Sequence, residues 1–95
     1  MKINELRIGM SGIELTAEVI EISEPRRVRT KFGYQTRVAR AMIKDDSGEI
    51  PLTLWGNQID EINVGDKIKI TDGYVREFRG ELQLNVPRKG KIERV

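Results

Sequence analysis

The sequence predicts an all-β domain whose strands close into a small barrel, and three observations support this. Its 95 residues, 38% of them hydrophobic, suffice for one modest core and therefore for a single domain over residues 1–95. Glycine, proline and aspartate interrupt the chain at short intervals, and the runs between them are rich in Ile, Val, Leu and Thr. The runs number five, which is fewer than an open sandwich usually needs and suits a sheet that curls on itself.

The order of the elements specifies the barrel further. We expect strands near residues 13–23, 35–44, 49–55, 66–76 and 81–86. One short helical turn fits residues 57–62, between the third and fourth strands, with Asn57 as its cap and Ile59 and Ile62 on one face. Five strands with a helical turn at this point are typical of an OB-type barrel.

The third strand shows which side chains should face outward. Alternation along the strand turns Ile50, Leu52 and Leu54 toward the core and leaves Thr53 and Trp55 outside. If residues 45–48 form a four-residue hairpin loop, the second strand pairs in the matching register. Its outward residues are then Val38, Arg40 and Met42.

The last hairpin follows the same logic. A two-residue turn at Arg79-Gly80 sets Tyr74, Arg76 and Phe78 opposite Asn85, Gln83 and Glu81, while Val75, Leu82 and Leu84 face the core. Ile68 and Ile70 look like core residues although they share the parity of Tyr74. The strand must therefore change face, and we expect a bulge at Asp72-Gly73.

Aromatic residues fall away from every position that the alternation assigns to the core. An exposed ring forgoes roughly 2 kcal/mol of burial, so another surface should cover it. Nucleobases stack on such rings with little regard to sequence, which makes Trp55, Tyr74 and Phe78 candidate stacking residues. The alternative is that the three rings close a barrel end or pack under the loop at residues 24–34. Phe32 and Tyr34 flank a loop tip, where loop packing and nucleic-acid contact remain equal alternatives.

Charge is segregated along the chain although the net charge is only +2. Residues 24–44 hold seven basic side chains against one acidic, whereas residues 45–72 hold two against seven. Basic segments that share one face would create a local positive field suited to a polyanion, although charge runs can also merely solvate a surface. The nucleic-acid-binding residues expected beside the three rings are Arg40, Thr53, Arg76, Arg79, Gln83, Lys31 and Arg37. Gln83 and Asn85 could hydrogen-bond base edges or sugars, although exposed amides are also common on strands.

The C-terminal basic group within residues 87–95 could extend the nucleic-acid path or form a solvated, flexible tail, and we favour the tail. Its members are Arg88, Lys89, Lys91 and Arg94.

Composition argues against catalysis. The chain has no cysteine or histidine, which removes thiolate metal sites and the commonest catalytic base. Asp45 and Asp46 precede Ser47-Gly48 between two expected strands, and these residue types favour a turn over a cation site. We expect neither an enzyme nor a cofactor. No signal peptide or membrane-spanning run is seen, so the expected location is intracellular, in the cytoplasm and associated with the nucleoid.

The motifs together resemble the archaeal single-stranded DNA-binding proteins and the OB domains of archaeal replication protein A. They are residues 46–50 (DSGEI), 52–56 (LTLWG), 64–66 (VGD), 73–74 (GY) and 78–84 (FRGELQL). The resemblance implies a monomeric OB fold in which three aromatics stack on bases, and the matching positions are Trp55, Tyr74 and Phe78. The family often carries a charged Gly-rich tail or tandem OB domains, and neither occurs within these 95 residues.

The expected function is therefore sequence-tolerant binding of single-stranded DNA in replication, recombination or repair. Other replication or repair proteins are conceivable partners. An RNA-binding OB module would use the same aromatics and arginines, so RNA remains an alternative ligand. A protein-interaction OB domain, with Trp55 at the centre of a hot-spot patch, is the other alternative.

Overall fold

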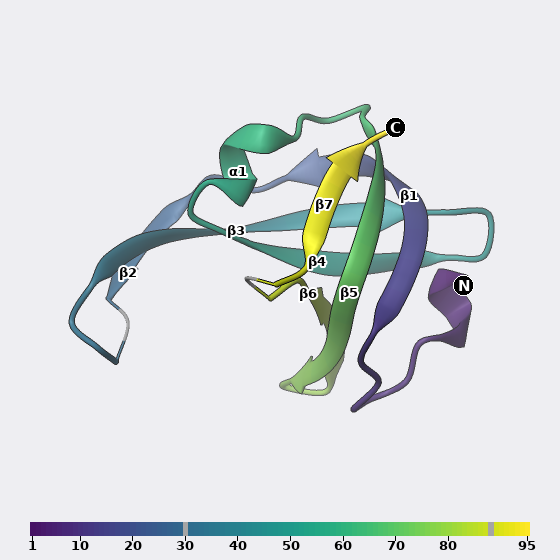
Figure 1. Cartoon of the computed structure of the whole chain (residues 1–95), viewed down its shortest axis with the longest axis horizontal. Coiled ribbons are helices and arrows are strands. Elements are labelled where there is room, and N and C mark those ends of the chain that lie inside the picture. The colour runs from purple at the N-terminus through teal and green to yellow at the C-terminus, as the bar shows by residue number, and fades with distance from the viewer. Residues whose placement is uncertain (30, 88) are drawn as a thin grey trace.

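The computed structural model describes every residue except Thr30 and Arg88. Its elements follow the expected order, with additions at both ends and in the first long connection (Figure 1). They are the 3₁₀ helix η1 (Ile3–Glu5), the strands β1 (Ile13–Ile22), β2 (Arg26–Arg29), β3 (Gln35–Lys44) and β4 (Glu49–Trp55), the helix α1 (Gln58–Glu61), and the strands β5 (Lys67–Phe78), β6 (Glu81–Asn85) and β7 (Lys91–Arg94).

The five expected strands form a closed ring of pairings. β1 pairs with β3, β3 with β4, β5 with β6, and β5 returns to β1, all antiparallel. β4 and β6 close the ring as a parallel pair. The predicted five-stranded architecture is thus confirmed, as is the helical turn between β4 and β5.

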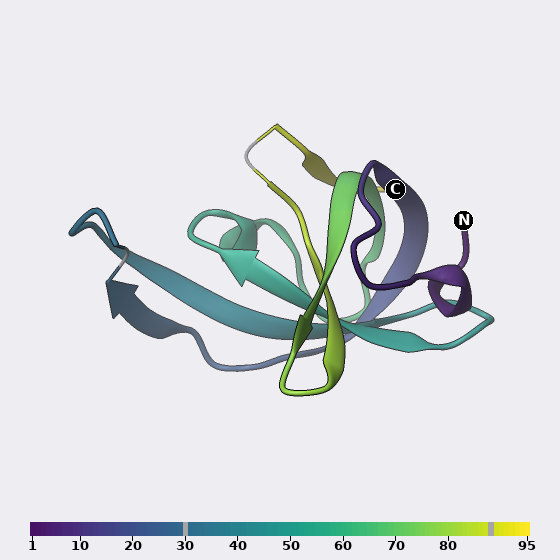
Figure 2. The ribbon, with the colours of Figure 1, turned by 90° about the horizontal axis from the view of Figure 1, so that it is seen from below.

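Two further strands extend this ring. β2 pairs with the first half of β3 and makes a two-stranded arm, which we call the β2–β3 arm, that projects from the body (Figure 2). β7 pairs with β5, and Ile92 lies opposite Ile70 and packs against the core. Residues 91–94 are therefore a paired strand and not a free tail, while Lys91, Glu93 and Arg94 remain exposed to solvent. Ile92 is half-buried and anchors the segment, while Lys91 and Glu93 point to the opposite side of the strand.

The core is aliphatic, and its pattern follows the alternation. Ala39, Ala41 and Ile43 lie opposite Leu54, Leu52 and Ile50, as the hairpin register predicts, and all six are buried. Among the described residues the largest fully buried side chains are isoleucine, leucine and valine, with no aromatic ring among them.

The register of β5 changes at the predicted bulge. Leu15 pairs with Ile70 but Ile13 pairs with Gly73, so β5 carries one extra residue in this interval. The left-handed backbone lies at Asp72 (φ 62°) and not at Gly73, where we expected glycine to absorb it. Gly73 serves packing instead, because a Cβ there would lie 3.2 Å from Ile70 and 3.3 Å from Leu84. The extra residue allows one strand to turn Ile68, Ile70 and Val75 all toward the core.

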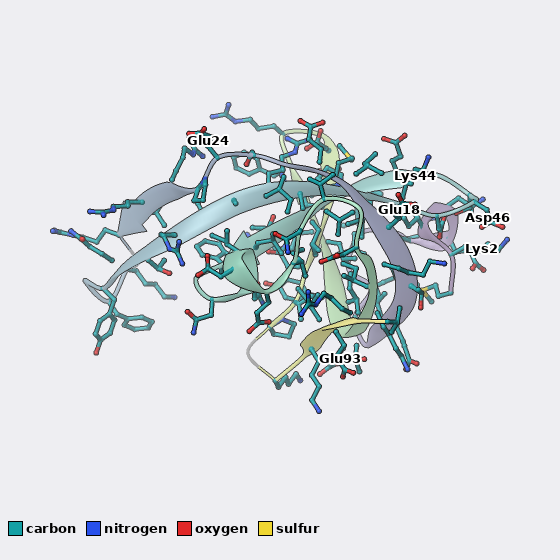
Figure 3. All side chains as sticks on the ribbon, turned by 90° about the horizontal axis from the view of Figure 1, so that it is seen from above. Lys2, Glu18, Glu24, Lys44, Asp46 and Glu93 are labelled. Carbon is teal, nitrogen blue, oxygen red and sulfur yellow. The ribbon has the colours of Figure 1, made fainter. Side chains whose placement is uncertain are left out.

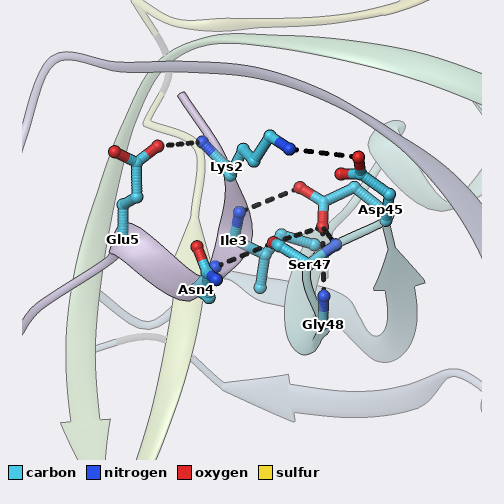
Figure 4. A network of polar contacts seen from close by, with 8 residues as sticks. Lys2, Ile3, Asn4, Glu5, Asp45, Ser47 and Gly48 are labelled. Atoms are coloured by element: carbon cyan, nitrogen blue, oxygen red, sulfur yellow. Dashed lines mark hydrogen bonds and ion pairs between the residues drawn. The ribbon is translucent and has the colours of Figure 1, made fainter.

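The N-terminal helix closes one end by docking on the β3–β4 loop (Figure 4). Oδ2 of Asp45 accepts the N–H of Ile3 at 2.9 Å, and Oδ1 accepts the N–H groups of Ser47 and Gly48 at 2.7 and 3.2 Å. Burial of this carboxyl opposes its ionisation. The Ser47 hydroxyl and the three amides outweigh that effect and hold the pKa of Asp45 below its ordinary value of 3.8. Both carboxyl oxygens are thus engaged in turn and docking contacts, as the turn interpretation predicts.

The short helix α1 differs from expectation in its cap. Asn57 occupies the capping position but has helical backbone angles and makes no side-chain cap hydrogen bond. Ile59 and Ile62 are buried as predicted. Gln58 links α1 to β4 and to the segment after β6. Its side chain accepts a hydrogen bond from the N–H of Trp55 at 3.0 Å and donates one to the carbonyl of Val86 at 3.3 Å.

Candidate nucleic-acid interface

One outer face of the ring brings together residues from four strands. The pairing register places Arg40 beside Thr53, Thr53 beside Asn85, and Asn85 beside Tyr74, so a single row crosses β3, β4, β6 and β5. Trp55 belongs to the neighbouring row and lies opposite Val38. Side chains of directly paired residues point to the same side of a sheet, so the residues of this row lie on one side of the four strands.

A depression of about 640 Å³, which we call the outer groove, runs along this face. It contains most of the residues that the sequence nominated. Its lining residues from the nominated set are Arg40, Thr53, Trp55, Arg76, Phe78, Arg79 and Gln83. The hairpin registers that turn these side chains outward are the ones predicted from alternation.

A second depression, of about 800 Å³, adjoins the outer groove at Trp55. Tyr74 lines this second depression and not the outer groove, so the three candidate stacking rings do not share one cavity. Trp55 lines both and stands where they meet. A ligand contacting all three rings must therefore be extended enough to pass from one depression to the other.

The exposure of the rings agrees with the prediction that they stand off the core. Trp55 is 42% exposed and Phe78 57%, and Tyr74 is half-buried. The guanidinium of Arg79 lies 5.2 Å from the centroid of the Phe78 ring, a cation–π contact that holds charge and ring together. The alternative that these rings pack beneath the loop at residues 24–34 does not describe Trp55 or Phe78, because a large part of each remains open to solvent.

Electrostatics differ between the two depressions. The outer groove is lined by four arginines, Arg26, Arg40, Arg76 and Arg79, against the acids Glu24 and Glu81. The second depression has Lys91 against Glu61 and Glu93. Phosphates should consequently prefer the outer groove, whereas the second depression suits neutral, flat groups.

One arginine of the outer groove is already paired. A nitrogen of the Arg40 guanidinium lies 2.9 Å from a carboxylate oxygen of Glu81, and both side chains are about half exposed. This ion pair connects β3 to the start of β6. An incoming phosphate must compete with Glu81 for Arg40.

Three expected contacts lie elsewhere. Arg37 has the inward parity of Ala39 and pairs with Asp60 of α1 at 2.7 Å, so it faces away from the outer groove. Lys31 lies at the tip of the β2–β3 arm, 5.5 Å from the centroid of the Phe32 ring. Asn85, considered for base contacts, is only 4% exposed because it sits mid-row between Thr53 and Tyr74. Sequence parity alone could not reveal that its neighbours cover it.

The structure also adds residues to the groove. Arg26 and Val38, which pair across the base of the β2–β3 arm, line it together with Ser23 and Glu24. The strand β2 has four residues, three of them arginine, and such a short, polar run does not identify a strand from sequence. Phe32 and Tyr34, whose role the sequence left open, are 75% and 73% exposed, so loop packing does not account for them.

Charged side chains also mark the end of the molecule opposite the arm. Figure 3 shows Lys2, Glu18, Lys44 and Asp46 at that end, with Glu24 on the other side near the arm. Lys2 pairs with Asp46 at 3.0 Å, and Glu18 lies opposite Lys44 on the neighbouring strand. Mixed signs at this end contrast with the arginine-rich outer groove.

The described residues contain neither a cluster of metal ligands nor a membrane-spanning helix. Outside Thr30 and Arg88, no three acidic side chains gather as ligands for a metal ion. Within the same described part of the chain, no helix has the length and apolar character to cross a bilayer.

The closed ring, the helical turn after β4 and the aromatic outer face define an OB-fold domain. Residues 6–94 match the family model described as single-stranded DNA binding protein Ssb-like, OB fold, and the chain belongs to this family. It is 36% identical over 91 residues to the single-stranded DNA binding protein Ssb of Saccharolobus solfataricus, covering 96% of this chain and 61% of that protein. It is 31% identical over 98 residues to replication factor A of Methanothermobacter thermautotrophicus, covering 97% of this chain and 12% of that protein.

Solved structures agree with this assignment. The second OB-fold domain of replication protein A from Methanococcus maripaludis matches with a TM-score of 0.83 and 30% identity, over 100% of this chain and 93% of that one. The replication factor A related protein from Methanobacterium thermoautotrophicum matches with a TM-score of 0.83 and 28% identity, over 100% and 89%. The chain spans less than two thirds of the length of the Saccharolobus protein.

Proposed function

We propose that this domain binds single-stranded DNA without strong sequence preference, in replication, recombination or repair. Trp55, Tyr74 and Phe78 stack on bases, and the arginines of the outer groove contact phosphates. The names of the relatives support this assignment, because the similar proteins are described as a single-stranded DNA binding protein and as replication factor A. The domain acts as a monomeric, intracellular binding module that performs no chemistry of its own.

The observation that carries the proposal is the combination of exposed rings and arginines on one face. Trp55 and Phe78 leave 42% and 57% of their surfaces open, beside four arginines that line the same groove. Stacking on a ring is worth about 1–3 kcal/mol per base and tolerates any base, while arginine–phosphate contacts carry no sequence information. The two together account for tight binding without sequence choice.

The order of the rings suggests how the strand lies. Phe78 lines the outer groove, Trp55 lines both depressions, and Tyr74 lines only the second one. A strand following this path keeps its backbone near Arg40, Arg76 and Arg79 and turns successive bases onto the rings. Gln83 and Thr53, which line the outer groove, donate hydrogen bonds to sugars or base edges.

The test uses the only tryptophan of the chain as its reporter. Titration with oligo-dT should quench the fluorescence of Trp55, with affinity falling as salt rises by a slope of about 0.7 for each phosphate contacted. Matched DNA and RNA oligonucleotides in competition then decide which nucleic acid is preferred. Unchanged fluorescence at low salt, together with no shift in an independent anisotropy titration, would refute the proposal.

Adjacent residues of β4 supply a matched pair of variants. Trp55→Ala should weaken oligo-dT binding by about 1–3 kcal/mol, or roughly 5- to 150-fold, and leave the free energy of unfolding nearly unchanged. Leu54→Ala removes a fully buried side chain and should cost about 2–5 kcal/mol of stability. Binding by the folded fraction of that variant should stay normal. Equal losses of stability from both variants would instead make Trp55 a structural residue.

A further inference from the structure

The β2–β3 arm has two faces, and only one of them belongs to the outer groove. Its register pairs Arg26 with Val38 and Val28 with Thr36, and these residues form the groove face, since Arg26 and Val38 line the groove. The alternate pairs point the other way. They are Arg27 with Arg37 and Arg29 with Gln35, and we call their surface the reverse face.

The reverse face is basic and nearly uncompensated. It carries three arginines and no carboxylate of its own, and Asp60 of α1 reaches only Arg37, at 2.7 Å. Arg27 and Arg29 are exposed and take part in no ion pair among the residues that the structure describes. Arg27 lies directly opposite Arg37, and like charges in that position destabilise a sheet. Asp60 offsets the charge of Arg37 alone, so Arg27 and Arg29 are the cations that remain for an anion to bind.

The chemistry of this face selects phosphate and not bases. Its residues are arginines and one glutamine, with no aromatic ring on which a base could stack. A single strand held by stacking has no partner here, whereas the backbone of a strand whose bases are paired elsewhere needs only cations.

The tip of the arm supplies the missing rings. Phe32 and Tyr34 are 75% and 73% exposed on either side of Gly33, whose φ of 87° makes the tight turn. Lys31 lies over the Phe32 ring at 5.5 Å. Two exposed aromatic rings at the end of a projecting arm could stack on the flat face of a terminal base pair, which a duplex exposes where it opens into single strands.

We propose that the β2–β3 arm recognises the fork between single-stranded and double-stranded DNA. One strand follows the groove face, the rings of Phe32 and Tyr34 stack on the last base pair, and Arg27 and Arg29 hold phosphates of the complementary strand. The inference rests on the proposed single-strand function for the groove half of this arrangement. The assignment of the reverse face as a phosphate-binding surface does not depend on which ligand the outer groove binds.

The experiment compares oligo-dT with a fork that carries the same oligo-dT tail on one strand. The wild-type protein should bind the fork more tightly and with a steeper salt dependence, by about 0.9 in slope for each added duplex phosphate. The double variant R27Q/R29Q should lose about 1.8 of that slope, equivalent to about a twelvefold difference over a fourfold change in salt. Its affinity for oligo-dT should stay within about twofold of wild type.

Controls separate this from a general loss of charge or of fold. The double variant K44Q/K67Q removes two exposed cations at positions that pair with Glu18, away from the arm, and should behave as wild type on both ligands. The variant F32A/Y34A should reduce fork affinity and spare oligo-dT. Thermal unfolding of every variant confirms that the domain is intact.

Each outcome decides a different claim. If wild type binds fork and oligo-dT equally, or if R27Q/R29Q loses both in the same proportion, the reverse face is not a separate duplex site. If wild type fails to bind oligo-dT while duplex binding remains dependent on Arg27 and Arg29, the proposed function fails and the reverse face stands.

Discussion

Removing the acid that pairs with Arg40 should strengthen single-strand binding, even though it breaks an ion pair of the folded protein. In the outer groove, Arg40 and Glu81 lie 2.9 Å apart, with side-chain exposures of 50% and 45%. A phosphate that reaches Arg40 must displace a carboxylate already there. Glu81→Gln keeps the size of the side chain and removes its charge.

The magnitude follows from the exposure of the pair. A solvent-exposed ion pair of this kind contributes about 0.2–1 kcal/mol, which is what a phosphate must overcome. The variant should therefore bind oligo-dT about 1.5- to 5-fold more tightly at low salt. Because Arg40 becomes a full phosphate contact, the slope of log affinity against log salt should steepen by about 0.7. Stability should fall by no more than about 1 kcal/mol.

The assay is fluorescence titration with oligo-dT at several salt concentrations, with Glu77→Gln as the matched control. Glu77 lies on β5 near the same hairpin and is exposed, but it does not line the outer groove. It changes the net charge equally, so it measures the general field effect. Equal gains from the two variants would attribute the effect to net charge and refute direct competition for Arg40. Weaker binding by Glu81→Gln would mean that the pair positions Arg40 for the ligand.

Three further outcomes concern the fold. Gly90→Ala should lower the thermal midpoint by several degrees, because the added Cβ would lie 2.7 Å from the Thr71 carbonyl and 2.8 Å from Val86. Such overpacking costs about 1–3 kcal/mol. Differential scanning calorimetry measures the effect, with Gly48→Ala as the control because its Cβ would meet nothing nearer than 4.0 Å. Because folding lowers the pKa of Asp45, the ionised carboxylate stabilises the fold fully above its ordinary pKa of 3.8, and this stabilisation is lost as pH falls through the lower folded value. Over that acidic range the urea midpoint of Asp45→Asn should therefore decline less steeply than that of wild type. Asp72→Gly should raise the thermal midpoint slightly, because glycine adopts the φ of 62° without a Cβ penalty.

The parts of the fold that could be predicted are those set by alternation and by short turns. The 45–48 loop fixes the β3–β4 register, and the Arg79-Gly80 turn fixes that of β5 and β6, so the outward positions of Trp55, Thr53 and Arg76 follow from local sequence. The bulge could be located as well, because Ile70 and Val75 cannot both face the core without an extra residue between them.

The remaining parts depend on contacts between distant segments. β2 and β7 have four residues each, and their existence depends on pairing with β3 and β5 and not on their own pattern. The burial of Asn85 depends on neighbours from two other strands. Arg37 was grouped with the groove arginines because of its place in the sequence, but its parity sends it toward α1, where Asp60 neutralises it. Charge counted along a strand thus overestimates the charge on either of its faces.

Strand alternation also explains how the domain can keep its largest rings exposed and remain folded. Along β4, Leu52 and Leu54 are fully buried while Thr53 and Trp55 point outward. Alternate residues of one strand therefore stabilise the core and form the outer surface. The buried set is aliphatic and lies in a ring of strands with each pairing closed, which makes the core independent of the rings. Substitutions on the outer face can therefore alter binding with little effect on folding. The same reasoning applies to the β2–β3 arm, whose two faces differ in chemistry although they share one pair of strands.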